Sequence, residues 1–396
     1  MAMKHSKPNR FCYKLAQIVS WFVATFVFKR KFVRNEIKDK DGPFVVIANH
    51  QAAWDFVNLI GARAKPMTFV ISKSFYSSLP IQGFLRKMGV IPKQQFQTNT
   101  ADLKKMKAVV DRGDPLVIYP AGLMCEDGLS TPIPGATYKF LKWMDTDIYV
   151  ARTQGTYFVM PKWGKGLRPG RTYMDIYKLF SKEELQALPL EEVQQKADAA
   201  LLYDAYREQE ELKVRYRNNR DIRGLEHVLY MCPECGKEFT ISVQGEDTLC
   251  CSNCDFEAVS DEFGFLQTEK GQLRYVSDWS KMIYAAQKQK LVSGAENSLS
   301  SNVEIRMVDE KKHKFVTVGS GDLRLQKGEL CLTGTIHGEE TQVVIPVGSV
   351  PTLPFSPGKY LELQDGNRIY RCLPEQGCLV MKFINMLKIW YRLDQI

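Results

Sequence analysis

The chain is 396 residues long, and its overall composition is that of an ordinary globular protein. At roughly 150 residues per domain, this length corresponds to about two to three domains. Its 44% hydrophobic and 25% charged residues argue against a disordered, collagen-like or polytopic membrane protein. Of the ten cysteines, four form two CxxC pairs and the rest are scattered, which indicates a metal site in a reducing compartment.

Basic charge is concentrated at the N-terminus. The formal net charge is +9, and residues 1–42 alone hold ten Lys and Arg against three acids. Such an end is typical of a segment that meets anionic lipid or nucleic acid. Leu15–Phe28 is uncharged, but as a helix it would be only about 21 Å long, against a hydrocarbon core of roughly 30 Å. Basic residues follow it in place of a small-residue cleavage site, so it is a poor signal peptide.

We therefore expect residues 1–42 to be a membrane-anchoring segment in which residues 8–34 form an interfacial or re-entrant anchor. Aromatic side chains would lie in the acyl boundary, and a basic cluster would lie on the lipid headgroups. The aromatic set is Trp21, Phe22, Phe26 and Phe28, and the basic set is Lys29, Arg30, Lys31 and Arg34. The alternative is a helix buried in a soluble core.

The apolar run Phe44–Ala48 predicts a strand that is covered on both faces. His50 and Asp55 follow it and are five residues apart, about 140° around a helix, so they cannot share a helical face. We expect His50 in the loop after the strand and Asp55 near the start of the next helix. A carboxylate on Nδ1–H would fix the imidazole tautomer and leave Nε2 free to accept a proton.

Four blocks in order resemble the PlsC-like glycerolipid acyltransferases, which include the lysophosphatidic acid acyltransferases. The segment 49–55, NHQAAWD, resembles their NHxxxxD block, and Gly89–Lys93 resembles their second block. Tyr119–Gly122 is similar to their FPEG block, and Asp147–Gly155 is similar to the fourth. The resemblance covers roughly residues 10–215.

This resemblance implies an α/β domain with a mixed sheet and flanking helices, at the cytoplasmic face of a membrane as a peripheral or monotopic protein. It implies transfer of a fatty acyl group from acyl-CoA or acyl carrier protein to a lysophospholipid-type hydroxyl, in phospholipid biosynthesis. His50 would be the general base, oriented by Asp55, and no nucleophilic Ser or Cys is needed. In this context Lys93 and Gly122 are substrate-binding candidates, Lys93 as a contact for a phosphate or headgroup.

The third block departs from the family pattern, which usually has Glu before the Gly and then Thr-Arg. Ala121, Leu123 and Met124 occupy these places. Glu126 and Arg152 are candidates to substitute for the missing groups, although the Glu126 segment also fits a solvated turn. A less charged acceptor, such as a lysophospholipid with a larger headgroup or a lysoglycolipid, fits these replacements about as well as lysophosphatidic acid.

Residues 43–225 are predicted to form this domain with a helical extension. The SxxE capping box at Ser181 and the composition of Leu190–Arg217 predict two helices over 181–217, with a solvated face.

Residues 226–265 are predicted to form a zinc ribbon. Cys232 and Cys235 are separated by 15 residues from Cys251 and Cys254, and two such knuckles are typical of a tetrahedral Cys₄ zinc site. Four thiolates leave no open coordination position, so we expect a structural zinc. The neighbouring Cys250 does not keep the CxxC spacing. Between Cys232 and Glu257, six acidic residues against one lysine favour a folding or protein-contact role, and no nucleic-acid partner is expected.

Residues 266–300 are predicted to be an amphipathic or loosely ordered connector, and residues 301–396 a β-rich domain. Strand-like runs recur between turn signals, and Leu379–Leu393 has the pattern of an amphipathic helix. The runs are Phe315–Val318, Glu329–Leu332, Gln342–Pro346, Tyr360–Leu363 and Arg368–Cys372. This order resembles a pleckstrin-homology or GRAM-type domain, with Lys382, Lys388 and Arg392 near a bilayer. The alternative is a protein-contact domain whose helix covers its own sheet.

The leading hypothesis is a membrane-associated acyltransferase that acts on anionic lipid surfaces, with protein contacts through the ribbon or the C-terminal domain. The rival is a catalytically degenerate acyltransferase-like, zinc-containing scaffold or lipid-binding protein.

Overall fold

The computed structural model describes residues 7–96, 99–269, 271 and 273–394. The chain divides into two compact units. The first comprises residues 1–76, 81–161 and 166–218, and the second comprises residues 77–80, 162–165 and 219–396.

The first unit is a seven-stranded mixed sheet with the strand order β1-β7-β6-β2-β5-β3-β4. Strands β6 and β7 pair antiparallel, and the other neighbours in the sheet pair parallel. The strands are β1 Lys31–Asn35, β2 Val45–Ala48, β3 Thr68–Ser72, β4 Ile91–Lys93, β5 Leu116–Ile118, β6 Ile148–Gln154 and β7 Tyr173–Phe180.

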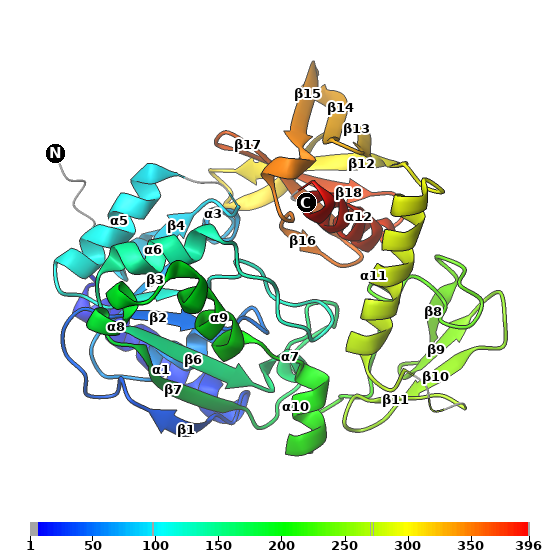
Figure 1. Ribbon diagram of the computed structural model, residues 1–396. Coiled ribbons are helices and arrows are strands. Elements are labelled where there is room, and N and C mark those ends of the chain that lie inside the picture. The colour runs from blue at the N-terminus through cyan, green and yellow to red at the C-terminus, as the bar shows by residue number, and fades with distance from the viewer. Residues whose placement is uncertain (1–6, 97–98, 270, 272, 395–396) are drawn as a thin grey trace. The chain divides into compact units, whose positions relative to one another are not determined.

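Helices cover both faces of this sheet (Figure 1). They are α1 Arg10–Phe26, α2 Asp55–Ile60, α3 Lys73–Ser77, α4 Gln82–Lys87, α5 Thr100–Asp111, α6 Ala136–Met144, α7 Thr156–Val159, α8 Lys182–Ala187, α9 Leu190–Leu201 and α10 Ala205–Leu212. A hydrophobic core lies on each face of the sheet. Strand β2 contributes side chains to both cores because successive side chains point to opposite faces. Val45 and Ile47 pack with residues of α5, α6 and α9, whereas Val46 and Ala48 pack with residues of α1 and α2. The predicted α/β fold with a mixed sheet and flanking helices is confirmed.

Helix α1 packs one side onto the sheet and exposes the other. Asn9 caps it by accepting a hydrogen bond from Cys12 N at 3.1 Å. Its buried residues are Tyr13, Ala16, Ser20 and Ala24. The exposed apolar residues are Phe11, Leu15, Ile18, Val19, Trp21, Phe22 and Phe26. We call these seven side chains the apolar face of α1. In the described part of the chain, no helix is both long and apolar enough to cross a membrane.

Two residues of the predicted anchor have other roles. Phe28 was expected in the acyl boundary, but its side chain is fully buried, so this prediction is wrong. Arg30 was expected on the headgroups, but its guanidinium donates to the carbonyl of Asn58 and lies over the ring of Phe32. Burial lowers the pKa of Arg30 to about 10. Both side chains therefore belong to the packing of the first unit.

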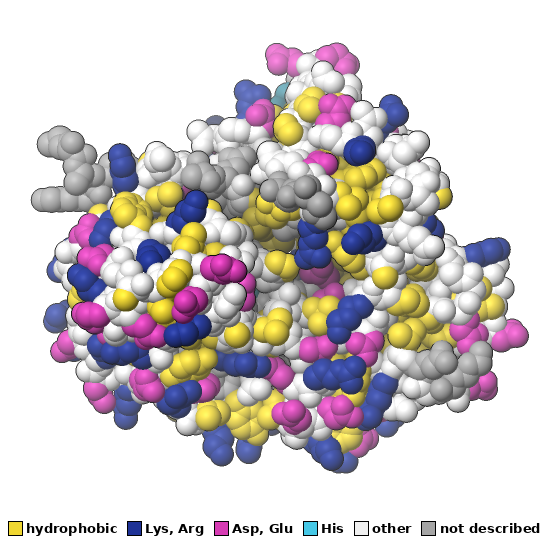
Figure 2. All heavy atoms as spheres, in the orientation of Figure 1, with side chains coloured by type: hydrophobic (Ala, Val, Ile, Leu, Met, Phe, Trp, Pro, Cys, Tyr) yellow, Lys and Arg dark blue, Asp and Glu magenta, His cyan; other side chains and the backbone are white. Residues whose placement is uncertain are grey.

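The helical extension contains three helices, α8, α9 and α10, where the sequence predicted two. Ser181 caps α8 as expected, because its Oγ accepts from Glu184 N at 3.1 Å. Pro189 follows α8, and Asp204 caps α10 by accepting from Tyr206 N, so each break has a local cause. Acidic and basic side chains are interspersed over α8 and α9 (Figure 2), as a solvated face requires.

The second unit begins with a small antiparallel sheet of strand order β11-β10-β9-β8. Its strands are β8 Ile241–Gln244, β9 Thr248–Cys251, β10 Glu257–Ser260 and β11 Leu266–Gln267. Helix α11, Val276–Ser293, follows within the predicted connector, and Trp279 on it is fully buried and donates from Nε1 to Met231 O at 2.9 Å. This part of the connector is therefore ordered and packed.

A second seven-stranded sheet, β15-β14-β13-β12-β18-β17-β16, completes this unit together with α12, Leu379–Leu393. All its neighbouring strands pair antiparallel. The strands are β12 Ser298–Asp309, β13 Lys314–Gln326, β14 Glu329–Ile336, β15 Glu339–Pro346, β16 Phe355–Ser356, β17 Tyr360–Asp365 and β18 Arg368–Pro374. Each predicted run lies in a strand. The sequence analysis missed β12 and β16.

Lys382 was expected near a bilayer, and this prediction is wrong. Its side chain is 7% exposed, and its Nζ forms ion pairs with Glu238 Oε2 at 2.6 Å and with Glu296. Lys290 on α11 reaches the other oxygen of Glu238 at 2.7 Å. These four residues, which we call the ionic cluster, tie α12 and α11 to the segment that precedes β8.

Candidate functional site

The carboxyl end of β2 is fixed to β6 by one side-chain amide. Asn49 Nδ2 donates to Thr153 O at 2.8 Å, and Thr153 N donates to Asn49 Oδ1 at 2.7 Å. This pair of bonds continues the parallel pairing of β2 and β6 past Ala48. The next residue, His50, therefore leaves the sheet at a defined point.

His50 lies in the loop after β2, and Asp55 is the first residue of α2. The His50 Nδ1 atom is 3.1 Å from Asp55 Oδ2. The same oxygen accepts from the backbone N of Gln51 at 2.7 Å and of Ala52 at 2.9 Å. Three donors on one oxygen of a side chain that is only 1% exposed hold the carboxylate in place. The imidazole therefore presents Nε2 away from Asp55.

His50 lines a hollow that has about 230 Å³ of empty space, part of it open to solvent. The side chain is 20% exposed, so a ligand can reach it. The hollow is lined by Ala48, Asn49, His50, Pro120, Ala121, Ser130, Thr131, Ile133, Leu201 and Tyr203. These residues come from the ends of β2 and β5, from the loop before α6, and from the end of α9.

A buried polar chain supports the loop that carries His50. Gln51 Oε1 accepts from Thr156 Oγ1 and Tyr157 N, each at 3.2 Å. Gln51 Nε2 faces Glu208 Oε2 at 3.5 Å, and Glu208 also pairs with Arg152 at 2.8 Å. Burial raises the pKa of Glu208, and the bond from Arg152 opposes this shift. The sequence analysis did not identify Gln51 or Glu208, because no local pattern marks their partners.

Tyr119 stacks beside the imidazole, with the two ring centroids 4.5 Å apart. Its hydroxyl is buried and has no hydrogen-bond partner among the described residues. Burial, followed by the charge of Asp55, raises the pKa of Tyr119, so the phenol stays neutral. The second oxygen of Asp55, Oδ1, is also buried without a described partner.

The four substrate-binding candidates are not among the described residues that line the hollow. Arg152 is held by Glu208, and Lys93 Nζ donates to Gln94 O at 3.0 Å. Gly122 adopts φ 71° and accepts at its carbonyl from Gln95. Glu126 is 7% exposed, so the alternative of a solvated turn is wrong for this residue. The lining residues Ser130, Thr131 and Tyr203 carried no recognisable signal in the sequence.

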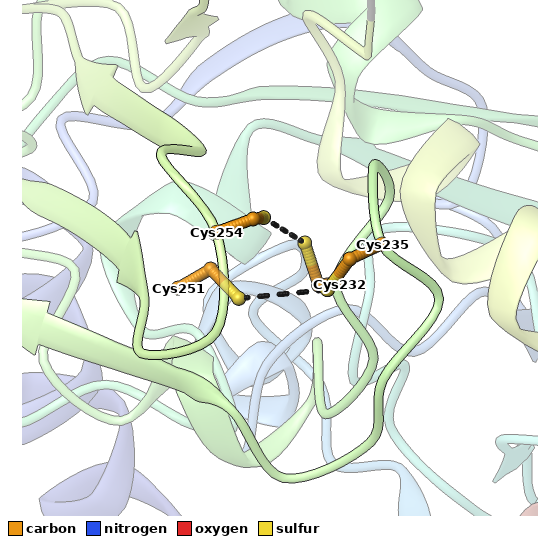
Figure 3. A group of neighbouring side chains, drawn as sticks. All are labelled: Cys232, Cys235, Cys251 and Cys254. Carbon is orange, nitrogen blue, oxygen red and sulfur yellow. Dashed lines mark hydrogen bonds between the residues drawn. The ribbon is translucent and has the colours of Figure 1, made fainter.

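The four cysteines of the two CxxC pairs converge in the second unit (Figure 3). Their sulfurs all lie within 4.8 Å of one another. Cys232 Sγ is 3.6 Å from Cys254 Sγ, and Cys235 Sγ is 3.8 Å from Cys251 Sγ. These separations exceed a disulfide bond of about 2.05 Å. Cys250 is outside the cluster, and its sulfur lies near Gln244 and Glu257.

The cluster fits a zinc ion. Tetrahedral coordination with Zn–S bonds of about 2.3 Å places the sulfurs about 3.8 Å apart, close to the observed spacing. Asn253 N also donates to Cys251 Sγ at 3.4 Å, and such a bond stabilises a thiolate. The pKa of Cys251 is lowered to about 6: burial raises it, but contacts with Thr240 and backbone amides outweigh burial.

The first unit contains a segment that matches a known protein family. Residues 29–164 match the family model described as Acyltransferase. Comparison with curated proteins finds no match. Among solved structures, the chain is similar to the 1-acyl-sn-glycerophosphate (LPA) acyltransferase PlsC from Thermotoga maritima, with 18% identity over 52% of this chain and 79% of that one, and a TM-score of 0.42.

A second similar structure is the Ran binding domain of the nuclear complex component Nup2 from Ashbya gossypii. It has 15% identity over 24% of this chain and 99% of that one, and a TM-score of 0.19. Both TM-scores are too low to establish a fold or an activity. The family model, by contrast, spans His50, Asp55 and all four sequence blocks. Within the first unit, residues 29–164 are therefore similar to the acyltransferase family.

Proposed function

We propose that this protein is a membrane-associated acyltransferase that moves a fatty acyl group from a thioester, acyl-CoA or acyl carrier protein, to the hydroxyl of a lysolipid. The observation that carries the proposal is the His50–Asp55 pair, bonded through Nδ1 at 3.1 Å beside a hollow that the imidazole lines. The match of residues 29–164 to the acyltransferase family model supports the same reaction class.

In the proposed reaction, His50 Nε2 accepts the proton of the acceptor hydroxyl while its oxygen attacks the thioester carbonyl. The C–O bond forms, the tetrahedral intermediate collapses, and the C–S bond breaks. The imidazolium then returns its proton to the departing thiolate. Asp55 stabilises the imidazolium and holds the tautomer that leaves Nε2 unprotonated beforehand.

A thiol that packs beside the His50 loop does not fit the role of a covalent nucleophile. Cys125 is fully buried, and its N–H donates to His50 O at 3.3 Å, so the side chain belongs to the loop packing. Burial raises the pKa of this thiol, which lowers the fraction of reactive thiolate. Direct attack by the acceptor hydroxyl is therefore the simpler mechanism.

The apolar face of α1 is proposed to rest on the membrane. It includes an aromatic cluster in which Phe22 lies 5.0 Å from Trp21 and 6.0 Å from Phe26 between ring centroids. Lys29 and Lys31 are exposed just after the helix, where they can meet anionic headgroups. An amphipathic helix of this kind lies in the bilayer interface. The domain would then act as a peripheral protein on the cytoplasmic face.

The second unit is proposed to have a structural or protein-contact role, with zinc bound by Cys232, Cys235, Cys251 and Cys254. Four thiolates fill a tetrahedral site and leave no position for substrate. The burial of Lys382 in the ionic cluster removes one of the cations expected at a bilayer, which favours protein contact over lipid binding for this unit.

The test is acyl transfer by the purified full-length protein, with labelled acyl-CoA and labelled acyl carrier protein offered to a panel of lysolipids. We expect labelled diacyl product, and a rate reduced roughly a thousandfold or more in His50→Ala. His337→Ala is the matched control, because His337 is exposed in a turn of the second unit.

A product formed equally fast by His50→Ala would overturn the proposed base. Failure of the wild-type protein with every donor and acceptor, despite binding to lysolipid vesicles, would support the degenerate scaffold. That rival rests on the third block, where Ala121, Leu123 and Met124 replace the usual polar residues.

A further inference from the structure

We infer that the acceptor subsite beside His50 takes an uncharged alcohol, such as a monoacylglycerol or a lysoglycolipid, and not a phosphate monoester. This inference rests on the proposed function and names its substrate class. It is carried by the chemistry of the hollow and of the groups packed around it.

The walls of the hollow hold no fixed positive charge. The ten described residues that line it include no lysine or arginine, and His50 is its only titratable side chain apart from the phenol of Tyr203. Ala121 forms part of the wall and is 8% exposed, so this part of the wall carries a methyl group and no charge.

The cations elsewhere in the same unit that were candidates for phosphate binding are occupied. Arg152 Nη2 is 2.8 Å from Glu208 Oε1, and this carboxylate is largely buried. Breaking the pair would leave the buried charge of Glu208 without a counter-ion. Lys93 Nζ donates to the carbonyl of Gln94 at 3.0 Å. Neither side chain lines the hollow.

Negative charge lies close behind the wall. Glu126 and Asp127 are 7% and 9% exposed, and they follow Cys125, whose N–H donates to His50 O. The charge of Asp127 acts on Tyr203, a lining residue, and both carboxylates act on Cys125. A phosphate dianion in this hollow would lose water close to these carboxylates, and none of the described lining residues is a lysine or arginine that would compensate its charge.

The geometry of the acceptor keeps the phosphate close to these carboxylates. In lysophosphatidic acid, only one methylene and one ester oxygen separate phosphorus from the carbinol carbon that is acylated. When that hydroxyl reaches His50 Nε2, the phosphate must therefore lie within the same hollow or at its mouth.

Two side-chain hydroxyls in the wall of the hollow can form hydrogen bonds with an uncharged alcohol. Ser130 and Thr131 line the hollow, are half-buried, and have side chains with no hydrogen bond to a described residue. The backbone of Ser130 is held, because its N–H donates to Tyr203 O at 3.1 Å. A hydroxyl both donates and accepts, so this pair matches the flanking hydroxyls of glycerol or a sugar.

The experiment compares three acceptors with the same acyl chain at equal mole fraction in mixed micelles: 1-oleoylglycerol, its 3-glucosyl derivative and 1-oleoylglycerol 3-phosphate. We expect kcat/KM for at least one uncharged acceptor to exceed that for the phosphate by tenfold or more. Equal or faster acylation of the phosphate overturns this inference and leaves the proposed function standing. Acylation of none of the three, with either donor, overturns this inference, and failure of the wider lysolipid panel as well contradicts the proposed function.

A second measurement uses Ser130→Ala, with Ser300→Ala as the control, since Ser300 is an exposed serine of the second unit. We expect Ser130→Ala to lower kcat/KM for the preferred uncharged acceptor about tenfold, and to leave the KM for the thioester and the melting temperature unchanged. Unchanged acceptor kinetics in Ser130→Ala would overturn the assignment of this hydroxyl.

Discussion

Oδ2 of Asp55 accepts three hydrogen bonds at once, from His50 Nδ1 and from the backbone amides of Gln51 and Ala52. The carboxylate therefore closes the turn that carries His50 and orients the imidazole in the same contact. Loop geometry and tautomer are set by one side chain, and a substitution at Asp55 tests both.

Asp55→Asn keeps an acceptor for the turn but removes the negative charge. An amide oxygen in the place of Oδ2 can still accept from His50 Nδ1 and from the two backbone N–H groups, but it cannot stabilise the imidazolium as a carboxylate does. We expect kcat to fall roughly a thousandfold or more with little change in melting temperature. Asp111→Asn, on the exposed end of α5, is the control. A variant with wild-type kcat would show that His50 needs no carboxylate.

Tyr119→Phe removes a buried hydroxyl that has no described partner. We expect the free energy of unfolding to stay the same or to rise by up to about 1 kcal/mol, because an unsatisfied polar group is lost. Tyr203→Phe is the contrasting variant, since that hydroxyl donates to His50 O at 3.2 Å. It should lose about 1 kcal/mol. Urea titration followed by fluorescence measures both, and equal losses would contradict the difference.

The apolar run Phe44–Ala48 and the order of the blocks were enough to predict the α/β fold and to place His50 and Asp55 around one strand end. These signals are local, since a strand, a loop and a helix start lie within eleven residues, 45–55. The cysteine cluster was similarly predictable, because CxxC spacing fixes two sulfurs on each turn.

The rest of the site depends on contacts between distant parts of the chain. Tyr203 reaches His50 from 153 residues away, and Glu208 reaches Gln51 from 157 residues away. Lys382 was misassigned for the same reason, since its partner Glu238 is 144 residues earlier. A charged residue on an amphipathic helix resembles a surface residue until its buried counter-ion is known.

Phe22→Glu tests the apolar face of α1. A carboxylate on this exposed stripe would have to enter the bilayer interface, so we expect sedimentation with anionic vesicles to weaken at least tenfold. Folding should be unaffected, because the side chain is 52% exposed. Val344→Glu, at an exposed position of β15, is the matched control. If both variants pellet like the wild-type protein, α1 is not the membrane contact.

Cys232→Ser removes one of the four proposed zinc ligands, and substitution of a nearby cysteine outside the cluster is the control. We expect loss of stoichiometric zinc and a lower melting temperature, because binding energy at a Cys₄ site contributes directly to folding. Cys250→Ser should keep one zinc per chain, since its sulfur faces Gln244 and Glu257 instead of the cluster. Equal zinc in both variants, measured by atomic emission, would show that the four-thiolate assignment is wrong.

The ionic cluster predicts acid sensitivity of the second unit. Burial alone would raise the pKa of Glu238, but the ammonium groups of Lys290 and Lys382 hold it below its ordinary value. The folded state therefore binds this proton less readily than the unfolded state, whose Glu pKa is about 4.3. The contribution of Glu238 is fully present above that pH and is lost as the pH falls through the lower, folded-state pKa.

Glu238→Gln should therefore reduce stability at pH 7 and flatten its decline between about pH 5 and pH 3. Glu310→Gln, at an exposed position in the turn after β12, should keep the wild-type slope. Urea unfolding at each pH, with zinc content measured alongside, separates this effect from metal loss. If the stability of Glu238→Gln falls with decreasing pH as steeply as that of the wild-type protein, other carboxylates cause the loss of stability in acid.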